Sequence, residues 1–104
     1  MSLPDDQLVL KELAKVSRIE AEHEVLHYLY FAKEGKASKA KKALEKLGYK
    51  VSSNRAADGA NWLVLAKHRI IPTEEAIEKS RISLEDLAKK CSGKYDGWEA
   101  AVVS

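Results

Sequence analysis

The sequence predicts an α+β protein, with a four-stranded antiparallel sheet of the ferredoxin-like βαββαβ type preceded by one additional helix. Helix-like and strand-like stretches follow in the order helix, then strand, helix, strand, strand, helix, strand. The two most apolar strands, residues 25–32 and 62–71, are the first and third, which this fold places in the centre of its sheet. A chain of 104 residues is long enough for one domain and too short for two.

The helices are predicted from apolar residues that recur at spacings of three and four. The first spans about residues 5–20, and the second spans residues 36–48. The third begins with Thr73 as its cap and runs to about Cys91, where Gly93 is expected to end it. A fresh capping sequence near Ser83 predicts an interruption of this helix.

Strands are predicted where β-branched and aromatic residues gather, over residues 25–32, 49–53, 62–71 and 94–103. The loop 54–61 contains Asp58-Gly59, which suits the turn between the second and third strands. We therefore expect a single domain, residues 1–104, composed of the N-terminal helix at about 5–20 and a ferredoxin-like core at about 22–103.

A second Asp-Gly pair, Asp96-Gly97, lies where no hairpin fits, because a helix ends immediately before it. We expect the start of an edge strand here, with the glycine marking a bulge. Without a bulge, strand alternation would point Asp96 and Trp98 to one face of the sheet and Tyr95 and Glu99 to the other. We expect Gly97 to permit the bulge and Trp98 to fill the core, so that both residues have mainly a structural role.

The composition excludes several classes of protein. A single cysteine, Cys91, excludes an internal disulfide and a cysteine-based zinc site and indicates a reducing compartment, the cytoplasm. The longest apolar runs are a few residues, so no membrane span is expected, and the first residues do not resemble a signal peptide. Glycine-rich phosphate loops and G-x-S-x-G are absent, and no carboxylate pair has an evident partner. We therefore expect no catalytic residues and no cofactor, with Cys91 as a small buried residue at a helix end.

The sequence His23-Glu24-Val25-Leu26-His27 matches the zinc-peptidase pattern H-E-x-x-H. That chemistry requires a helix, in which the two histidines share one metal ion. In a strand His23 and His27 would lie roughly 13 Å apart along the chain. We therefore expect no metal, with His23 exposed and His27 on a face of the sheet, and metallopeptidase stays the last alternative.

Two further patterns concern surfaces. Residues 33–50 contain seven lysines and two glutamates, and a basic helix of this kind can meet phosphates or an acidic partner, although most of these lysines are expected simply to solvate the outer face. The first strand is apolar on both faces, with Val25, Leu29 and Phe31 on one and Leu26, Tyr28 and Tyr30 on the other. Helices cover one face of such a sheet, so the second must be covered by the N-terminal helix, another copy of the chain or a partner.

The sequence resembles the bacterial regulator of ribonuclease E activity B family over about residues 22–103. The resemblance rests on Tyr95-Asp96-Gly97-Trp98-Glu99, on "HYLYF" (27–31), on "LEKLGYKV" (44–51) and on Trp62. It implies the same ferredoxin-like fold and a function that is not enzymatic, because characterised relatives bind ribonuclease E and inhibit its cleavage of RNA.

We therefore expect a cytoplasmic protein that regulates RNA decay through contact with a protein partner, ribonuclease E. The candidate partner-binding residues are Tyr95, Asp96, Gly97, Trp98 and Glu99. Two alternatives stay open: an RNA-binding ferredoxin-like module, and a small oligomer, such as a homodimer, with another protein partner. The third strand lacks the aromatic pattern of the common RNA-recognition module.

Overall fold

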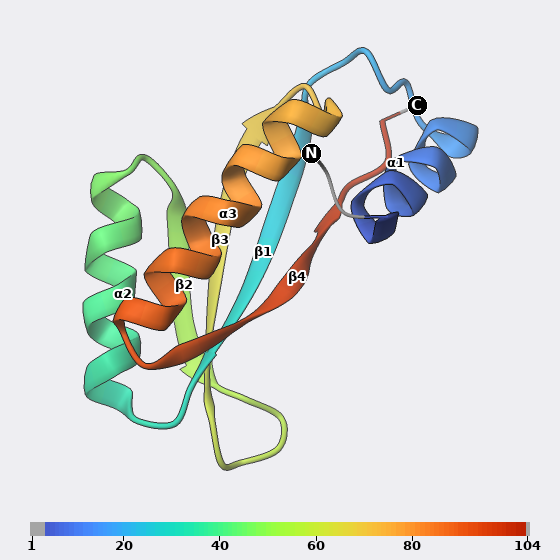
Figure 1. The fold of residues 1–104 in the computed structure, drawn as a ribbon. Coiled ribbons are helices and arrows are strands. Elements are labelled where there is room, and N and C mark those ends of the chain that lie inside the picture. The colour runs from blue at the N-terminus through green and yellow to red at the C-terminus, as the bar shows by residue number, and fades with distance from the viewer. Residues whose placement is uncertain (1–3, 104) are drawn as a thin grey trace.

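The computed structural model describes residues 4–103 and contains three helices and four strands within them (Figure 1). The helices are α1 (Pro4–Val16), α2 (Glu34–Lys46) and α3 (Glu74–Lys90). The strands are β1 (His23–Phe31), β2 (Lys50–Arg55), β3 (Trp62–Ile70) and β4 (Gly93–Ala100). The α+β class and the order of elements are confirmed, while residues 1–3 and 104 of the expected domain lie outside the described part.

The four strands form one antiparallel sheet in the order β2-β3-β1-β4. The apolar strands β1 and β3 lie in the centre, as their composition predicts, and β2 and β4 form the edges. In this register His27 of β1 lies opposite Ala66 of β3 and Trp98 of β4. The expected turn at Asp58 joins β2 to β3, with the Asp58 carboxylate accepting backbone N–H bonds from Ala60 and Asn61.

Helices α2 and α3 cover one face of the sheet (Figure 1). Alternate residues of β1 are buried against them, as a strand with one core face requires. The helices contribute small and aliphatic side chains at helical spacing. The buried apolar residues of this layer are Val25, Leu29, Phe31, Ala37, Ala40, Leu44, Val64, Ala66, Ile77, Leu84 and Ala88.

Helix α3 differs from the sequence prediction at two points. It continues through Ser83 without interruption, because Leu84 prolongs the buried stripe that begins at Ile77. The helix ends near Cys91, as predicted, but Gly93 is not the residue that ends it. Ser92 takes the left-handed conformation after the helix (φ 58°), and Gly93 already belongs to β4.

Gly93 is required for a different reason, which is close packing. A Cβ atom at this position would lie 2.3 Å from the ring of Phe31 and 2.8 Å from the carbonyl oxygen of Tyr30.

Within residues 4–103, no helix is long and apolar enough to cross a membrane.

Candidate partner-binding site

Strand β4 contains a β-bulge within the Tyr95–Glu99 segment. Tyr28 of β1 pairs with Gly97, whereas the next residue, Leu29, pairs with Tyr95, so Asp96 is the extra residue. Gly97 has a φ of +122°, a conformation that side-chain-bearing residues rarely adopt. The bulge predicted from this glycine is therefore confirmed.

The bulge changes which side chains share a face of the sheet. Tyr95 and Trp98 lie three residues apart, yet both are opposite β1 residues that face the helices. Asp96 and Glu99 are exposed to solvent. The simple alternation, with Asp96 beside Trp98 and Tyr95 beside Glu99, is wrong because the extra residue shifts the pattern by one.

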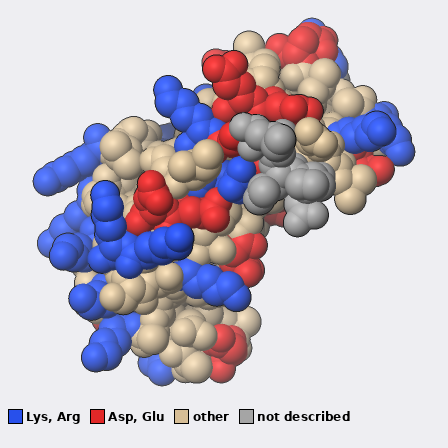
Figure 2. Space-filling view, viewed as in Figure 1, with Lys and Arg blue, Asp and Glu red and all other residues tan. Residues whose placement is uncertain are grey.

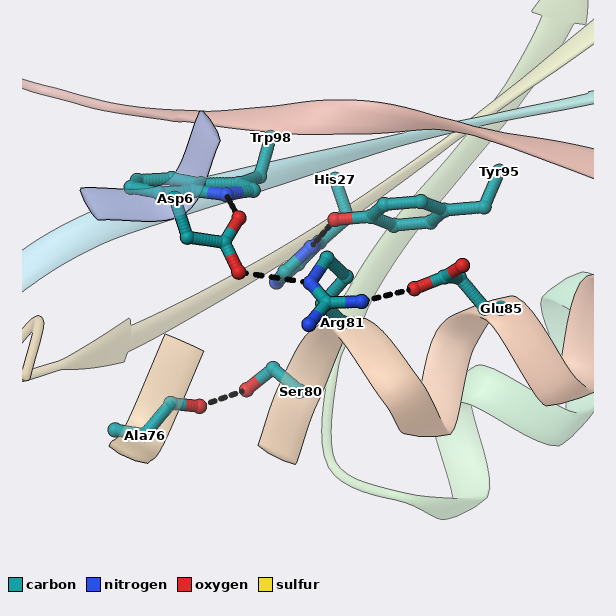
Figure 3. Close-up of polar contacts among 8 residues, drawn as sticks. All are labelled: Asp6, His27, Ala76, Ser80, Arg81, Glu85, Tyr95 and Trp98. Carbon is teal, nitrogen blue, oxygen red and sulfur yellow. Dashed lines mark hydrogen bonds and ion pairs between the residues drawn. The ribbon is translucent and has the colours of Figure 1, made fainter. Parts of the chain in front are cut away.

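The indole of Trp98 takes part in a buried polar network that joins three elements (Figure 3). Its Nε1–H donates to Oδ1 of Asp6 in α1 at 2.9 Å. Nε of Arg81 in α3 donates to the other oxygen of that carboxylate at 2.8 Å, and Nη1 donates to Glu85. The Arg81 and Asp6 side chains are 10% and 4% exposed, so this is an ion pair shielded from water. The Asp6 carboxylate therefore links α1 to Arg81 of α3 and to Trp98 of β4.

The hydroxyl of Tyr95 lies beside the buried ring of His27 (Figure 3), and His27 in turn contacts His68. It lies 2.8 Å from Nδ1 of His27, and Nε2 of His27 lies 3.1 Å from Nε2 of His68. A hydrogen bond between two such nitrogens requires that one ring donates and the other accepts. Tyr49 completes the cluster, with its ring centroid 4.7 Å from that of His68.

Burial determines the protonation of this histidine cluster. It lowers the pKa of His27 to about 3, with a further contribution from the neighbouring His68, and it also lowers the pKa of His68. Both rings are therefore neutral at pH 7. Burial likewise raises the pKa of Tyr95, so its hydroxyl keeps its proton. The arrangement is a neutral hydrogen-bonded chain inside the helix-covered face.

The H-E-x-x-H segment is a strand, as expected, and its two histidines lie on the same face of β1. His23 is not exposed, however. It is fully buried, and its ring nitrogens lie 2.7 Å from Oγ of Ser17 and 2.7 Å from the carbonyl oxygen of Ala21. The loop between α1 and β1 folds over it and supplies both partners. In the described part of the chain, no three His, Cys, Asp or Glu side chains are grouped closely enough to hold a metal ion.

Two members of these networks, Asp6 and Arg81, were not singled out from the sequence. Arg81 carried a signal, because it falls on the apolar stripe of α3 between Ile77 and Leu84. A charge at a buried position requires a partner of opposite charge. Cys91 is 4% exposed and packs in the core, which confirms its expected burial.

The second face of the sheet carries an apolar strip. No helix within residues 4–103 lies over it, because α1 packs beside α3 on the opposite face. The N-terminal helix is therefore excluded as its cover. Leu26, Tyr28, Tyr30, Leu63 and Leu65 form the strip, and all five are half-buried by one another.

Charged side chains surround this strip. Lys67 lies 3.8 Å from Glu24 and Arg69 lies 3.9 Å from Glu22 at one end of the strands. At the β4 edge the Tyr28 hydroxyl donates to the Glu99 carboxylate, and this bond raises the pKa of Tyr28 to about 12. An apolar centre with a polar rim is the usual anatomy of a protein-binding surface. The bond between Tyr28 and Glu99 therefore joins the apolar strip to the Tyr95–Glu99 segment of β4.

The buried polar groups, by contrast, form hydrogen bonds within the protein. Within residues 4–103, no buried side-chain nitrogen or oxygen lacks a hydrogen-bond partner. The structure is an α+β fold with one open sheet face, and an apolar surface of this kind is typical of proteins that bind a partner.

The comparison with family models agrees with this class. The model of the family Regulator of ribonuclease activity B matches residues 4–100. The chain belongs to this family, as its resemblance indicated. The family's name describes regulation of ribonuclease activity, which points to a regulatory and not a catalytic role. A search of the curated proteins gave no match.

Proposed function

We propose that this protein binds ribonuclease E and inhibits its cleavage of RNA through protein–protein contact, as a cytoplasmic regulator that is not itself an enzyme and needs no cofactor. Membership of the ribonuclease-regulator family supports the kind of partner. We also propose that the chain is one domain with a ferredoxin-like core, since its elements follow the order βαββαβ after α1 and its central strands are β1 and β3.

The observation that carries the proposal is the uncovered apolar strip on the sheet. Two tyrosines and three leucines at the centre of an open face offer the aromatic and apolar contacts that dominate binding energy in protein interfaces. The Tyr95–Glu99 segment then divides into two roles. Asp96 and Glu99, which are exposed, are proposed to contact the partner. Tyr95, Gly97 and Trp98 position the edge strand.

A paired set of variants tests the strip. Tyr30→Ala with Leu63→Ala shortens two neighbouring side chains of the strip, whereas the matched control, Leu8→Ala with Ile82→Ala, shortens two apolar side chains that are 59% and 48% exposed on α1 and α3. Binding to purified ribonuclease E is measured by calorimetry, and cleavage of a fluorescent RNA reports inhibition. Loss of a central aromatic anchor lowers the binding free energy by about 2 kcal/mol, which weakens the affinity about 30-fold.

We expect the strip variant to lose binding and inhibition together, while the control retains both. Equal loss in the two variants, or unchanged binding in the strip variant, would contradict the proposed surface. Light scattering of the same proteins tests the alternative that the protein is a homodimer. A wild-type dimer that becomes monomeric in the strip variant, without any binding of ribonuclease E, would show that a second copy covers the face.

The edge residues are tested by charge reversal. Asp96→Lys with Glu99→Lys should leave the melting temperature within about 2 °C, because exposed charges contribute little to stability. The same change should weaken capture of ribonuclease E. The control, Glu12→Lys, reverses an exposed charge on α1 and should bind normally. Normal binding by the edge variant would remove Asp96 and Glu99 from the proposed interface.

A further inference from the structure

Charge is distributed unevenly over this protein. The seven lysines and two glutamates of residues 33–50 carry a net charge of +5, whereas the whole chain carries +2, so the remaining residues sum to −3. Figure 2 shows this separation, with lysine and arginine side chains gathered over the side of the molecule where α2 lies. The positive end is thus a local feature that the overall charge conceals.

Helix α2 arranges four of its lysines in one line. Lys36, Lys39, Lys42 and Lys46 fall within about 120° of arc at 100° per residue and extend over about 15 Å. We call these four residues the lysine stripe. Its members are all exposed, and within residues 4–103 none of them forms an ion pair with an acidic side chain.

The glutamates of the helix lie away from this stripe. Glu34 and Glu45 fall on the other flank of α2, beside the half-buried Lys41. The core-facing residues, such as Ala40, separate the two flanks on the buried side. The stripe is therefore uniformly positive over three turns.

The composition of the stripe favours a nucleic acid over a protein as its occupant. Protein interfaces are built around aromatic and apolar anchors and are depleted in lysine. The nearest large exposed apolar side chain, Leu47, is at the C-cap of α2 and not at the centre of the stripe. Lysines without anchors suit the phosphate backbone of a nucleic acid, because positive charge dominates binding to phosphates and requires no apolar anchor.

We propose that the lysine stripe of α2 binds the phosphate backbone of single-stranded RNA without sequence preference. Membership of a family of ribonuclease regulators selects RNA among the nucleic acids. The stripe lies on the helical side of the sheet, and the apolar strip lies on the other side. RNA contact is therefore independent of the proposed contact with ribonuclease E and is tested without that enzyme.

The experiment measures fluorescence anisotropy of a labelled 20-nucleotide poly(U) with the full chain. The stripe variant replaces Lys36, Lys39, Lys42 and Lys46 by Gln, which keeps a good helix former at each position. A control variant replaces four exposed basic residues of α1, its following loop and α3 by Gln: Lys11, Lys15, Arg18 and Lys79. Both variants lose four positive charges, so net charge cannot distinguish them.

We expect the wild-type protein to bind with a dissociation constant of about 1–100 μM at 100 mM salt. Four phosphate contacts predict a slope of log K against log salt of about −2.8, so affinity should fall about 50-fold between 50 and 200 mM salt. The stripe variant should bind at least tenfold more weakly, and the control less than threefold.

Three results would overturn the proposal. They are no binding by the wild-type protein at 100 mM salt, equal weakening in the two variants, and displacement of poly(U) by polyglutamate as efficiently as by unlabelled poly(U). The last result would assign the stripe to an acidic protein segment. Circular dichroism and thermal melts of both variants confirm that α2 is intact, so a loss of binding reports on the surface.

Discussion

Acid should destabilise this protein through His27, well before its carboxylates are protonated. His27 is completely buried between the sheet and the helices, and burial lowers its pKa to about 3, whereas an unfolded chain has a histidine pKa of about 6.5. Above pH 6.5 neither state binds the proton. Below pH 6.5 the unfolded state binds it and the native state does not, so stability is lost progressively from pH 6.5 down to about pH 3.

The magnitude follows from these two pKa values. Integrating proton uptake by the unfolded chain from pH 7 to pH 5 gives a loss of about 2 kcal/mol in the free energy of unfolding from His27. The limiting slope is about 1.4 kcal/mol per pH unit. Most aspartates and glutamates stay ionised above pH 5, so this window isolates the histidines. His68 adds to the loss, because burial lowers its pKa in the same direction.

The assay is urea denaturation at intervals between pH 7 and pH 5 for the wild-type protein and for His27→Gln. Glutamine can retain a hydrogen bond but does not titrate, so the variant can be less stable at every pH and still have the shallower slope. We expect the wild-type protein to lose about 2 kcal/mol more than the variant over this range. Parallel curves for the two proteins, or an NMR titration that shows the folded His27 ring charging near pH 6.5, would refute the reasoning.

Three further predictions concern packing and conformation, and all are checked by thermal and urea unfolding. Gly93→Ala should cost about 1–3 kcal/mol, because its Cβ would overlap the ring of Phe31; a variant as stable as wild type would show that the ring can move aside. Asp6→Ala should lower the free energy of unfolding by about 3 kcal/mol, because it leaves the buried Arg81 with only Glu85 as an ionic partner. A loss below 1 kcal/mol would mean that water replaces the carboxylate. Ser92→Gly should stabilise by about 0.5–1 kcal/mol, since Ser92 has a φ of 58°; no gain would indicate that the serine side chain relieves the strain locally.

The sequence was sufficient for the order of elements, because periodicity and turn residues are local signals. Apolar content also placed β1 and β3 in the centre of the sheet, since central strands are buried on more sides. The prediction that Gly93 ends α3 failed because a glycine can be selected for close packing as well as for its backbone freedom. Nothing local distinguishes these two uses, and here the deciding contact, with Phe31, comes from a distant strand.

The site was harder to predict, because its contacts join residues far apart in the chain. Asp6 and Arg81 are 75 positions apart and meet once α1 has packed beside α3. His23, which was expected to be exposed near the start of its strand, is buried by the loop that precedes it, through Ser17 and the backbone of Ala21. Hydrogen bonds made by histidine are compatible with burial, so residue type alone does not decide where the ring lies.

The bulge at Asp96-Gly97 divides the Tyr95–Glu99 segment into residues that face the helices and residues that are exposed to solvent. Because the bulge adds one residue, Tyr95 and Trp98 point together into the helix-covered face, where the hydroxyl and the indole N–H reach a buried histidine and a buried aspartate. Gly97 is needed because of its backbone conformation. Packing, backbone conformation and polar contacts thus explain why Tyr95, Gly97 and Trp98 occupy these positions, and contact with a partner is not needed to explain them. Asp96 and Glu99 are different, because their exposed carboxylates are not required by the core. A search for the surface that meets a ribonuclease should therefore begin with these two carboxylates and follow the bond from Glu99 across the open sheet.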